Sequence, residues 1–149
     1  MTQVSFYHLT KTSVDEALPK LLEKVLENDS KALMVVENNE EIPHYDKLLW
    51  SVGGTRLIPH GINGEGDEEM QPVLISEKIE NNNKANFLVT IGKYDSEEFV
   101  GFERSLYIFN GNDKVELEFA RNKWKGLKSN DKLTLKYYFQ NDKGNWEEK

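Results

Sequence analysis

The sequence predicts a single α/β domain over residues 1–149, with a mainly parallel or mixed sheet flanked by helices. Three observations favour this class. Strand-like and helix-like segments alternate along the chain, Ala32–Val36 is a continuous apolar run, and no internal repeat or long linker interrupts the pattern. A chain of 149 residues with 38% hydrophobic residues is the size of one compact domain and can bury a core of its own.

The first elements are expected to be a strand, an amphipathic helix and a buried strand. Val4–Leu9 is short and rich in β-branched and aromatic residues, as is typical of a strand. Ser13 and Glu16 have the spacing of a capping box and precede a helical apolar stripe. The stripe consists of Leu18, Leu21, Leu22, Val25 and Leu26. Pro19 lies inside it and is expected to distort the first turns or to move the helix start. Ala32–Val36 is expected to be a strand buried on both faces.

The middle of the chain is expected to hold a short helix, three short strands and a polar loop. Ile42–Trp50 is typical of a short helix, with Pro43 near its first turn. His60–Gln71 is glycine-rich and polar, as expected of a loop. The predicted strands are Arg56–Pro59, which follows a turn at Gly53–Gly54, then Pro72–Ser76 and Asn86–Ile91.

The last third is expected to contain two strands separated by a long helix. Asp95–Glu103 is predicted to be a short helix or turn, and Ser105–Asn110 a strand. Asp113 and Glu116 can cap a helix over Lys114–Lys128. Leu133–Phe139 is the final predicted strand.

Positive charge is concentrated near the C-terminal end of an acidic chain. The net charge is −7, yet residues 119–140 hold six basic residues and one acid. The rest of the chain holds 13 basic and 25 acidic residues, so its net charge is −12. This asymmetry predicts local attraction for an acidic partner on a protein that repels acidic surfaces elsewhere.

Motifs for catalysis and for cofactor binding are missing from the sequence. The glycine-rich stretch Gly61–Gly66 lacks the lysine of a phosphate loop and is followed by acids that would repel phosphates. There is no cysteine and no serine in a nucleophile-elbow pattern. A metal site that combines His60 with Asp67 or Glu68 stays open as an alternative to a solvated loop histidine. We therefore expect a protein that is not an enzyme and holds no cofactor or metal.

Membrane segments and export signals are not recognisable either. No apolar run approaches the length of a membrane span, and the N-terminus lacks a basic region followed by an apolar one. We expect a cytoplasmic protein that does not bind membranes.

The predicted helix over Lys114–Lys128 carries a cationic face beside an apolar stripe. Arg121, Lys125 and Lys128 are spaced for one face, and Trp124 lies at its border. The stripe consists of Leu117, Ala120, Trp124 and Leu127. An arginine can hold a carboxylate with two hydrogen bonds while an aromatic ring provides an apolar wall. This combination suits an acidic peptide that ends in a hydrophobic residue. The alternative is a core tryptophan beside solvated cations that stabilise the helix C-terminus.

Several short stretches together resemble a known family. They are "VSFYHL", "ALPKLLEKVLE", "DKLLW", "LIPHG", "QPVLIS", "FNGND", "ARNKWKGLK" and "YYFQNDKGNW". In this combination the sequence resembles the chi subunits of the bacterial DNA polymerase III holoenzyme, which are accessories of its clamp loader. The resemblance implies a fold like that of mononucleotide-binding α/β proteins, without a working nucleotide site. It also implies a non-enzymatic accessory of a DNA-directed DNA polymerase.

The resemblance further implies two binding surfaces. Chi subunits connect the clamp loader, through its psi subunit, to the acidic C-terminal tail of single-stranded DNA-binding protein. The tail-binding residues would be Arg121, Trp124, Lys125, Lys128, Phe109 and Asn110. A tyrosine is more common in the family at the position of Trp124, so this tryptophan would either widen or block the pocket. The psi-binding residues would be Trp50 and Leu57, whose alternative is ordinary core packing.

Two other classes of function remain to be weighed. A nucleic-acid-binding protein could use the same basic helix on phosphates, but the net charge of −12 elsewhere would weaken such binding, so tight direct binding is not expected. An unrecognised hydrolase or metal enzyme has no motif in its favour.

Overall fold

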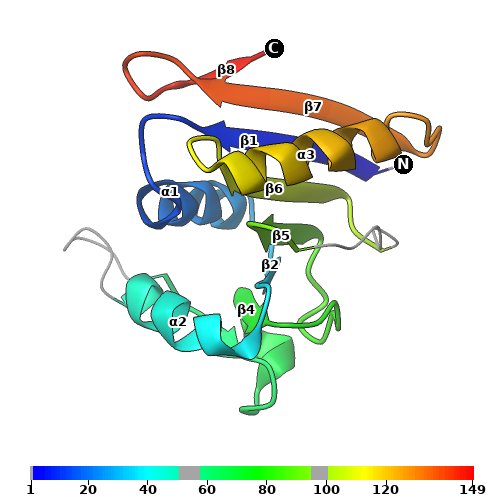
Figure 1. The fold of residues 1–149 in the computed structure, drawn as a ribbon. Helices are drawn as coiled ribbons and strands as arrows, with labels where there is room; N and C mark the ends of the chain where they lie inside the picture. The colour runs from blue at the N-terminus through cyan, green and yellow to red at the C-terminus, as the bar shows by residue number, and fades with distance from the viewer. Residues whose placement is uncertain (1, 51–57, 95–100) are drawn as a thin grey trace.

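The computed structural model describes residues 2–50, 58–94 and 101–149 (Figure 1). The strands are β1 (Thr2–Leu9), β2 (Ala32–Val35), β3 (Gly61–Ile62), β4 (Val73–Ser76), β5 (Phe87–Ile91), β6 (Arg104–Asn110), β7 (Leu133–Gln140) and β8 (Trp146–Glu148). The α-helices in these ranges are α1 (Val14–Glu27), α2 (Ile42–Trp50) and α3 (Lys114–Leu127), and the 3-10 turns there are η1 (Asn39–Glu41) and η3 (Glu68–Met70).

The described residues form one α/β domain around an eight-stranded sheet in the order β3-β4-β2-β5-β6-β1-β7-β8. Neighbouring strands are parallel from β3 to β7, whereas β7 and β8 are antiparallel. The sheet is therefore mixed and mainly parallel, which confirms the predicted fold class.

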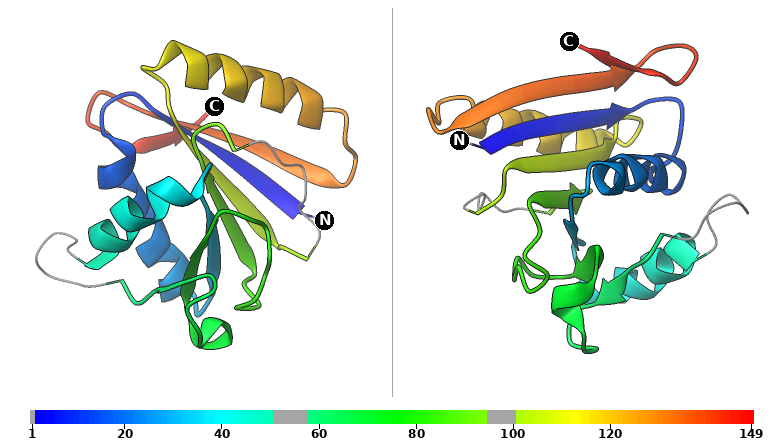
Figure 2. Two further views of the ribbon diagram at one scale, coloured as in Figure 1. Left: turned by 60° about the horizontal axis from the view of Figure 1, so that its bottom comes forward. Right: turned by 180° about the vertical axis from the view of Figure 1, so that it is seen from behind.

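Helices cover both faces of the sheet (Figure 2). On one face α1 and α2 pack on a core that includes Leu18, Leu22 and Leu49. On the other face α3 packs on a separate core with Phe6 and Phe109. β2 contributes to both cores and is fully buried, as its continuous apolar sequence predicted.

Local sequence signals set the start of α1. The side chain of Ser13 accepts a hydrogen bond from the backbone N–H of Glu16, and the Glu16 carboxylate accepts one from the Ser13 backbone. This confirms the predicted capping box. Pro19 is buried inside the helix but does not move its start, which stays at Val14. The capping box and the buried apolar stripe outweigh the one backbone hydrogen bond that proline cannot make.

The strands at the two sheet edges differ from the prediction. Gly61–Ile62 pairs with β4, whereas the predicted strand Arg56–Pro59 is not found where the chain is described, at Ile58 and Pro59. A proline has no N–H for the ladder, so the strand begins beyond it. Arg56, Leu57 and the predicted turn at Gly53–Gly54 lie outside the described residues. The strand at Trp146–Glu148 was not predicted.

The start of α3 combines a confirmed prediction with a correction. Asp113 is the N-cap, and its carboxylate accepts hydrogen bonds from the backbone of Val115 and Glu116. Glu116 was expected to complete the cap, but its carboxylate accepts from the backbone N–H of Asn110 instead. It thereby ties the helix to the end of β6. Of the predicted segment Asp95–Glu103, residues 95–100 lie outside the described residues, and Gly101 is in a turn.

Candidate functional site

A groove with a volume of about 660 Å³ lies between α3 and the strands β1 and β7. Figure 1 labels these three elements. Its lining residues are His8, Thr10, Leu117, Arg121, Trp124, Lys125, Tyr137, Phe139 and Lys149. Three of the residues predicted to bind a peptide tail, Arg121, Trp124 and Lys125, are therefore brought together on one groove.

Secondary-structure periodicity explains why these side chains meet. Leu117, Arg121 and Trp124 follow one another at spacings of four and three residues, so they share one face of α3. His8 is two residues from Thr10 on the chain, and its register partner on the neighbouring parallel strand is Phe139. Alternate side chains of β1 and β7 therefore point toward the helix. The groove has one wall from α3 and one from the sheet.

Trp124 forms an apolar wall without filling the groove. Its ring meets Phe6 edge to face, with centroids 5.1 Å apart, and meets Tyr137 in the same way at 5.5 Å. The side chain is half-buried against the α3 core while it still lines the groove. Edge-to-face contacts are among the arrangements that aromatic pairs prefer, and here they pack the ring against the core.

The charged residues on the groove are cations from two sides. Arg121 and Lys125 come from α3, while Lys149 follows β8 and places its Nζ 6.0 Å from the centroid of the Tyr137 ring. None of the described lining residues is acidic. In the described part of the chain, no side-chain hydrogen bond or ion pair engages Arg121, which is exposed. Its guanidinium is thus available to an anionic ligand.

His8 lies at the floor of the groove, where nearby positive charges affect its pKa. Its Nδ1 is 2.7 Å from the hydroxyl of Tyr137. Burial, followed by the charges of Lys149 and Arg121, lowers the pKa of His8 below the usual value of a histidine. Burial also raises the pKa of Tyr137, while Arg121 lowers it. Two cations from different elements therefore act on the same point.

The structure places the other predicted tail-binding residues away from the groove surface. Phe109 is fully buried beneath it and packs on the ring of His8 at 5.0 Å, so it supports the floor. Asn110 ends β6, where its side-chain oxygen accepts a hydrogen bond from the backbone of Asn112. Lys128 is the exposed C-cap of α3 and is not a lining residue. Sequence reasoning missed the lining residues His8, Thr10, Tyr137, Phe139 and Lys149. Strand alternation puts Tyr137 and Phe139 on one face of a strand, but it does not indicate that this face lies opposite α3.

Of the two residues predicted to bind the psi subunit, Trp50 is among the described residues. Trp50 ends α2 and is 51% exposed, so it is not a core residue. Its ring lies 4.7 Å from that of His60. Leu57 lies outside the described residues.

His60 takes part in an internal network rather than in a site with Asp67 or Glu68. Its Nδ1 is 2.8 Å from the carbonyl oxygen of Ile58, and its Nε2 is 2.6 Å from a carboxylate oxygen of Asp46. Glu68 accepts a hydrogen bond from the backbone N–H of Gly64. Within residues 2–50, 58–94 and 101–149, no cluster of three or more histidines, cysteines or acids could hold a metal ion. No helix in these ranges is long and apolar enough to span a membrane.

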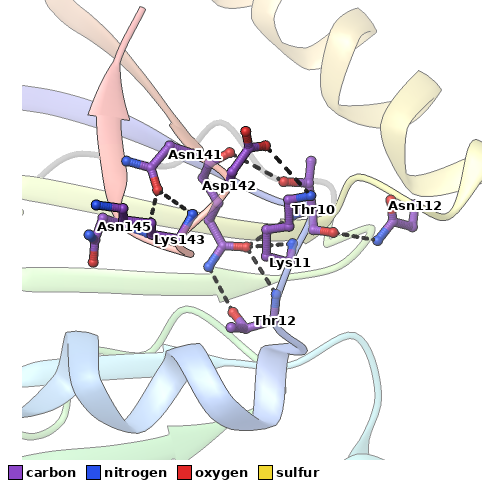
Figure 3. A network of polar contacts seen from close by, with 9 residues as sticks. Thr10, Lys11, Thr12, Asn112, Asn141, Asp142, Lys143 and Asn145 are labelled. Atoms are coloured by element: carbon purple, nitrogen blue, oxygen red, sulfur yellow. Dashed lines mark hydrogen bonds and ion pairs between the residues drawn. The ribbon is translucent and has the colours of Figure 1, made fainter.

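The turn between β1 and α1 is the place where related α/β folds hold phosphate groups. Here the side-chain oxygen of Gln140 accepts hydrogen bonds from the backbone N–H groups of Thr10, Lys11 and Thr12, at 3.0, 2.9 and 3.1 Å. Figure 3 shows this turn beside the turn that carries Asp142. Successive N–H groups of this kind make an anion-binding concavity, and in this chain a side-chain amide fills it.

Together, the mainly parallel sheet and the open groove of cations and aromatic rings define an α/β protein with a surface suited to an anionic, partly apolar ligand. A family model described as "DNA polymerase III chi subunit, HolC" matches residues 1–134, and the chain belongs to this family. The match covers β1 through the start of β7 and ends before Tyr137, Phe139 and Lys149.

A relative supports the same assignment. The "Probable DNA polymerase III subunit chi" of Rickettsia prowazekii (strain Madrid E) is 26% identical to this chain over 109 residues. The match covers 73% of this chain and 66% of that relative, so it spans slightly less than two thirds of the relative's length.

Proposed function

We propose that this protein is a non-enzymatic replication adaptor of the DNA polymerase III holoenzyme. Its α3 groove would bind the acidic C-terminal tail of a single-stranded DNA-binding protein, and the surface around Trp50 would bind the psi subunit of the clamp loader. The observation that carries the proposal is the convergence of Arg121, Trp124 and Lys125 on one groove whose opposite wall includes the aromatic residues Tyr137 and Phe139.

The groove offers a separate contact for each part of such a tail. Arg121 can hold the terminal carboxylate with two hydrogen bonds, and Lys125 adds a second positive charge. A terminal aromatic side chain fits between Trp124 on the helix and Phe139 on the sheet. One charged grip and one apolar contact correspond to roughly micromolar binding, or about −8 kcal/mol.

The support for the psi surface is the exposure of Trp50. A large aromatic side chain that is 51% exposed at the end of a helix is typical of an interface anchor. Its contact with the buried His60 restricts the indole while leaving one side open to a partner.

A titration with two labelled ligands tests the tail-binding role. One ligand is an acidic peptide that ends in phenylalanine with a free carboxylate, and the other is single-stranded DNA. We expect the peptide to bind at micromolar concentration and the DNA to bind more weakly, because the chain outside residues 119–140 has a net charge of −12. Tighter binding of the DNA would favour a nucleic-acid-binding protein instead.

A matched pair of variants locates the site. Arg121→Ala should weaken peptide binding by about 1.5–3 kcal/mol, the usual range for hydrogen bonds to a charged group. Lys128→Ala removes the same charge from the same helix but outside the groove lining, so it should cost less than about 0.5 kcal/mol. Equal losses in the two variants would indicate unspecific charge attraction.

A further inference from the structure

His8 is the histidine that lines the groove, and both Arg121 of α3 and Lys149 after β8 act on its ring. It lies on β1, and its Nδ1 is 2.7 Å from the hydroxyl of Tyr137 on β7. Its ring packs on Phe109 of β6 at 5.0 Å. Gly111, which follows β6, leaves room for the ring, because a Cβ at this glycine would overlap the imidazole.

The charged side chains that line the groove around His8 are all positive. Arg121 and Lys125 line the groove from α3, and Lys149 lines it after β8. Tyr137 is the other titratable neighbour, and burial raises its pKa, so its hydroxyl is uncharged near neutral pH. None of the described lining residues has an acidic side chain that would offset the cations.

The hydrogen bond to Tyr137 is compatible with both protonation states of His8. When the neutral ring carries its proton on Nε2, the tyrosine hydroxyl donates to Nδ1, whereas in the charged ring Nδ1–H donates to the tyrosine oxygen. Protonation therefore exchanges donor and acceptor without breaking the contact. The site can take up a proton without rearranging its floor.

We propose that His8 is a specificity-determining residue of the groove that takes up a proton when a carboxylate ligand binds. The inference rests on the proposed binding of an acidic tail. A carboxylate held between Arg121 and Lys149 cancels part of the repulsion that keeps His8 neutral, so the proton becomes more stable in the complex. The imidazolium then adds a positive charge beneath the anion.

The direction of the pH effect follows from this linkage. Burial, Lys149 and Arg121 hold the pKa of free His8 below its usual value, and the bound anion raises it. The affinity for the acidic peptide should therefore rise as the pH falls through the histidine range, by about three- to tenfold between pH 7.5 and 5.5. Uptake of one proton limits the change to about tenfold per pH unit. The ligand's own carboxylates stay ionised across most of this range.

Calorimetric titration with the same acidic peptide tests the proposal. At pH 6 the heat of binding is measured in two buffers whose protonation enthalpies differ, MES and imidazole. The wild-type protein should show net proton uptake, and His8→Gln should lose it. His44→Gln is the matched control, since His44 is exposed on α2, where it contacts Asp15, and does not line the groove. It should keep the wild-type uptake.

A second measurement on the wild-type protein covers the case in which His8→Gln does not fold. The His8 ring resonances are titrated with pH by NMR, without peptide and at saturation, and the pKa should be higher in the complex. Three results would overturn this inference while leaving the proposed function intact, provided that the peptide binds. They are unchanged proton uptake in His8→Gln, proton release instead of uptake by the wild-type protein, and a His8 pKa that is the same with and without peptide. If the wild-type protein binds no peptide at either pH, the proposed function fails together with this inference.

Discussion

Thr12 and Gln140 hydrogen-bond to each other twice, although they lie 128 positions apart in the chain. The backbone N–H of Thr12 donates to the Gln140 side-chain oxygen at 3.1 Å, and Gln140 Nε2 donates to the Thr12 hydroxyl at 2.8 Å. The same oxygen accepts from Thr10 and Lys11. The end of β7 therefore completes the turn that opens α1.

Gln140→Ala should lower the free energy of unfolding by about 2–4 kcal/mol, because three backbone N–H groups lose a hydrogen bond worth about 0.5–1.5 kcal/mol each. Gln3→Ala is the control, since the amide of Gln3 donates to the hydroxyl of Ser5 and satisfies no backbone group in that contact. Urea unfolding of both variants measures the difference. A loss in Gln140→Ala no larger than in Gln3→Ala would mean that water replaces the amide.

The wild-type protein should not bind ATP in calorimetric titrations. The N–H groups of the β1–α1 turn are occupied by Gln140, and in the loop Gly61–Gly66 the backbone N–H of Gly64 donates to the Glu68 carboxylate. Stoichiometric ATP binding that disappears when Gly61–Gly66 is altered would contradict this prediction.

Trp50→Ala should abolish co-purification with a clamp-loader subunit and should change the free energy of unfolding by less than about 1 kcal/mol, as is usual for exposed positions. The neighbouring Leu49 is fully buried, so Leu49→Ala should cost about 2–5 kcal/mol. Thermal unfolding and pull-down of the two variants separate an interface role from a core role. Unfolding of Trp50→Ala would show that the indole is needed for packing.

Amidation of the peptide's C-terminus should weaken its binding as much as Arg121→Ala does. Both changes remove one side of the same proposed charge pair, so their effects should not add when they are combined. A double-mutant cycle by fluorescence anisotropy measures the coupling. Undiminished binding of the amidated peptide would show that Arg121 does not hold the carboxylate.

The substitution of glycine by alanine should have opposite effects at Gly111 and Gly126. At Gly111 the new Cβ would overlap the ring of His8 and lie 2.7 Å from the backbone oxygen of Leu9, so about 1–3 kcal/mol of stability should be lost. Gly126 is exposed inside α3, where alanine should stabilise the helix by about 0.5–1 kcal/mol. Equal midpoints in thermal unfolding would contradict the close approach at Gly111.

Elements whose signals lie within a few turns of chain could be predicted from the residues alone. Ser13 and Glu16 predicted the start of α1, and the apolar run of Ala32–Val36 predicted a strand buried on both faces. Helical spacing also placed Arg121 and Trp124 on neighbouring positions of one helix surface. These inferences succeed because capping and amphipathic periodicity depend on residues three to seven positions apart.

The residues that lie opposite this helix surface depend on long-range strand pairing and could not be predicted. Tyr137 and His8 meet across 129 positions because β7 pairs in parallel with β1, and no local pattern encodes this register. Trp146–Glu148 becomes a strand because β7 offers it an edge, and Lys149 reaches the groove as a result. A binding groove needs two walls, and its second wall is set by strand pairing between segments that are far apart in the sequence.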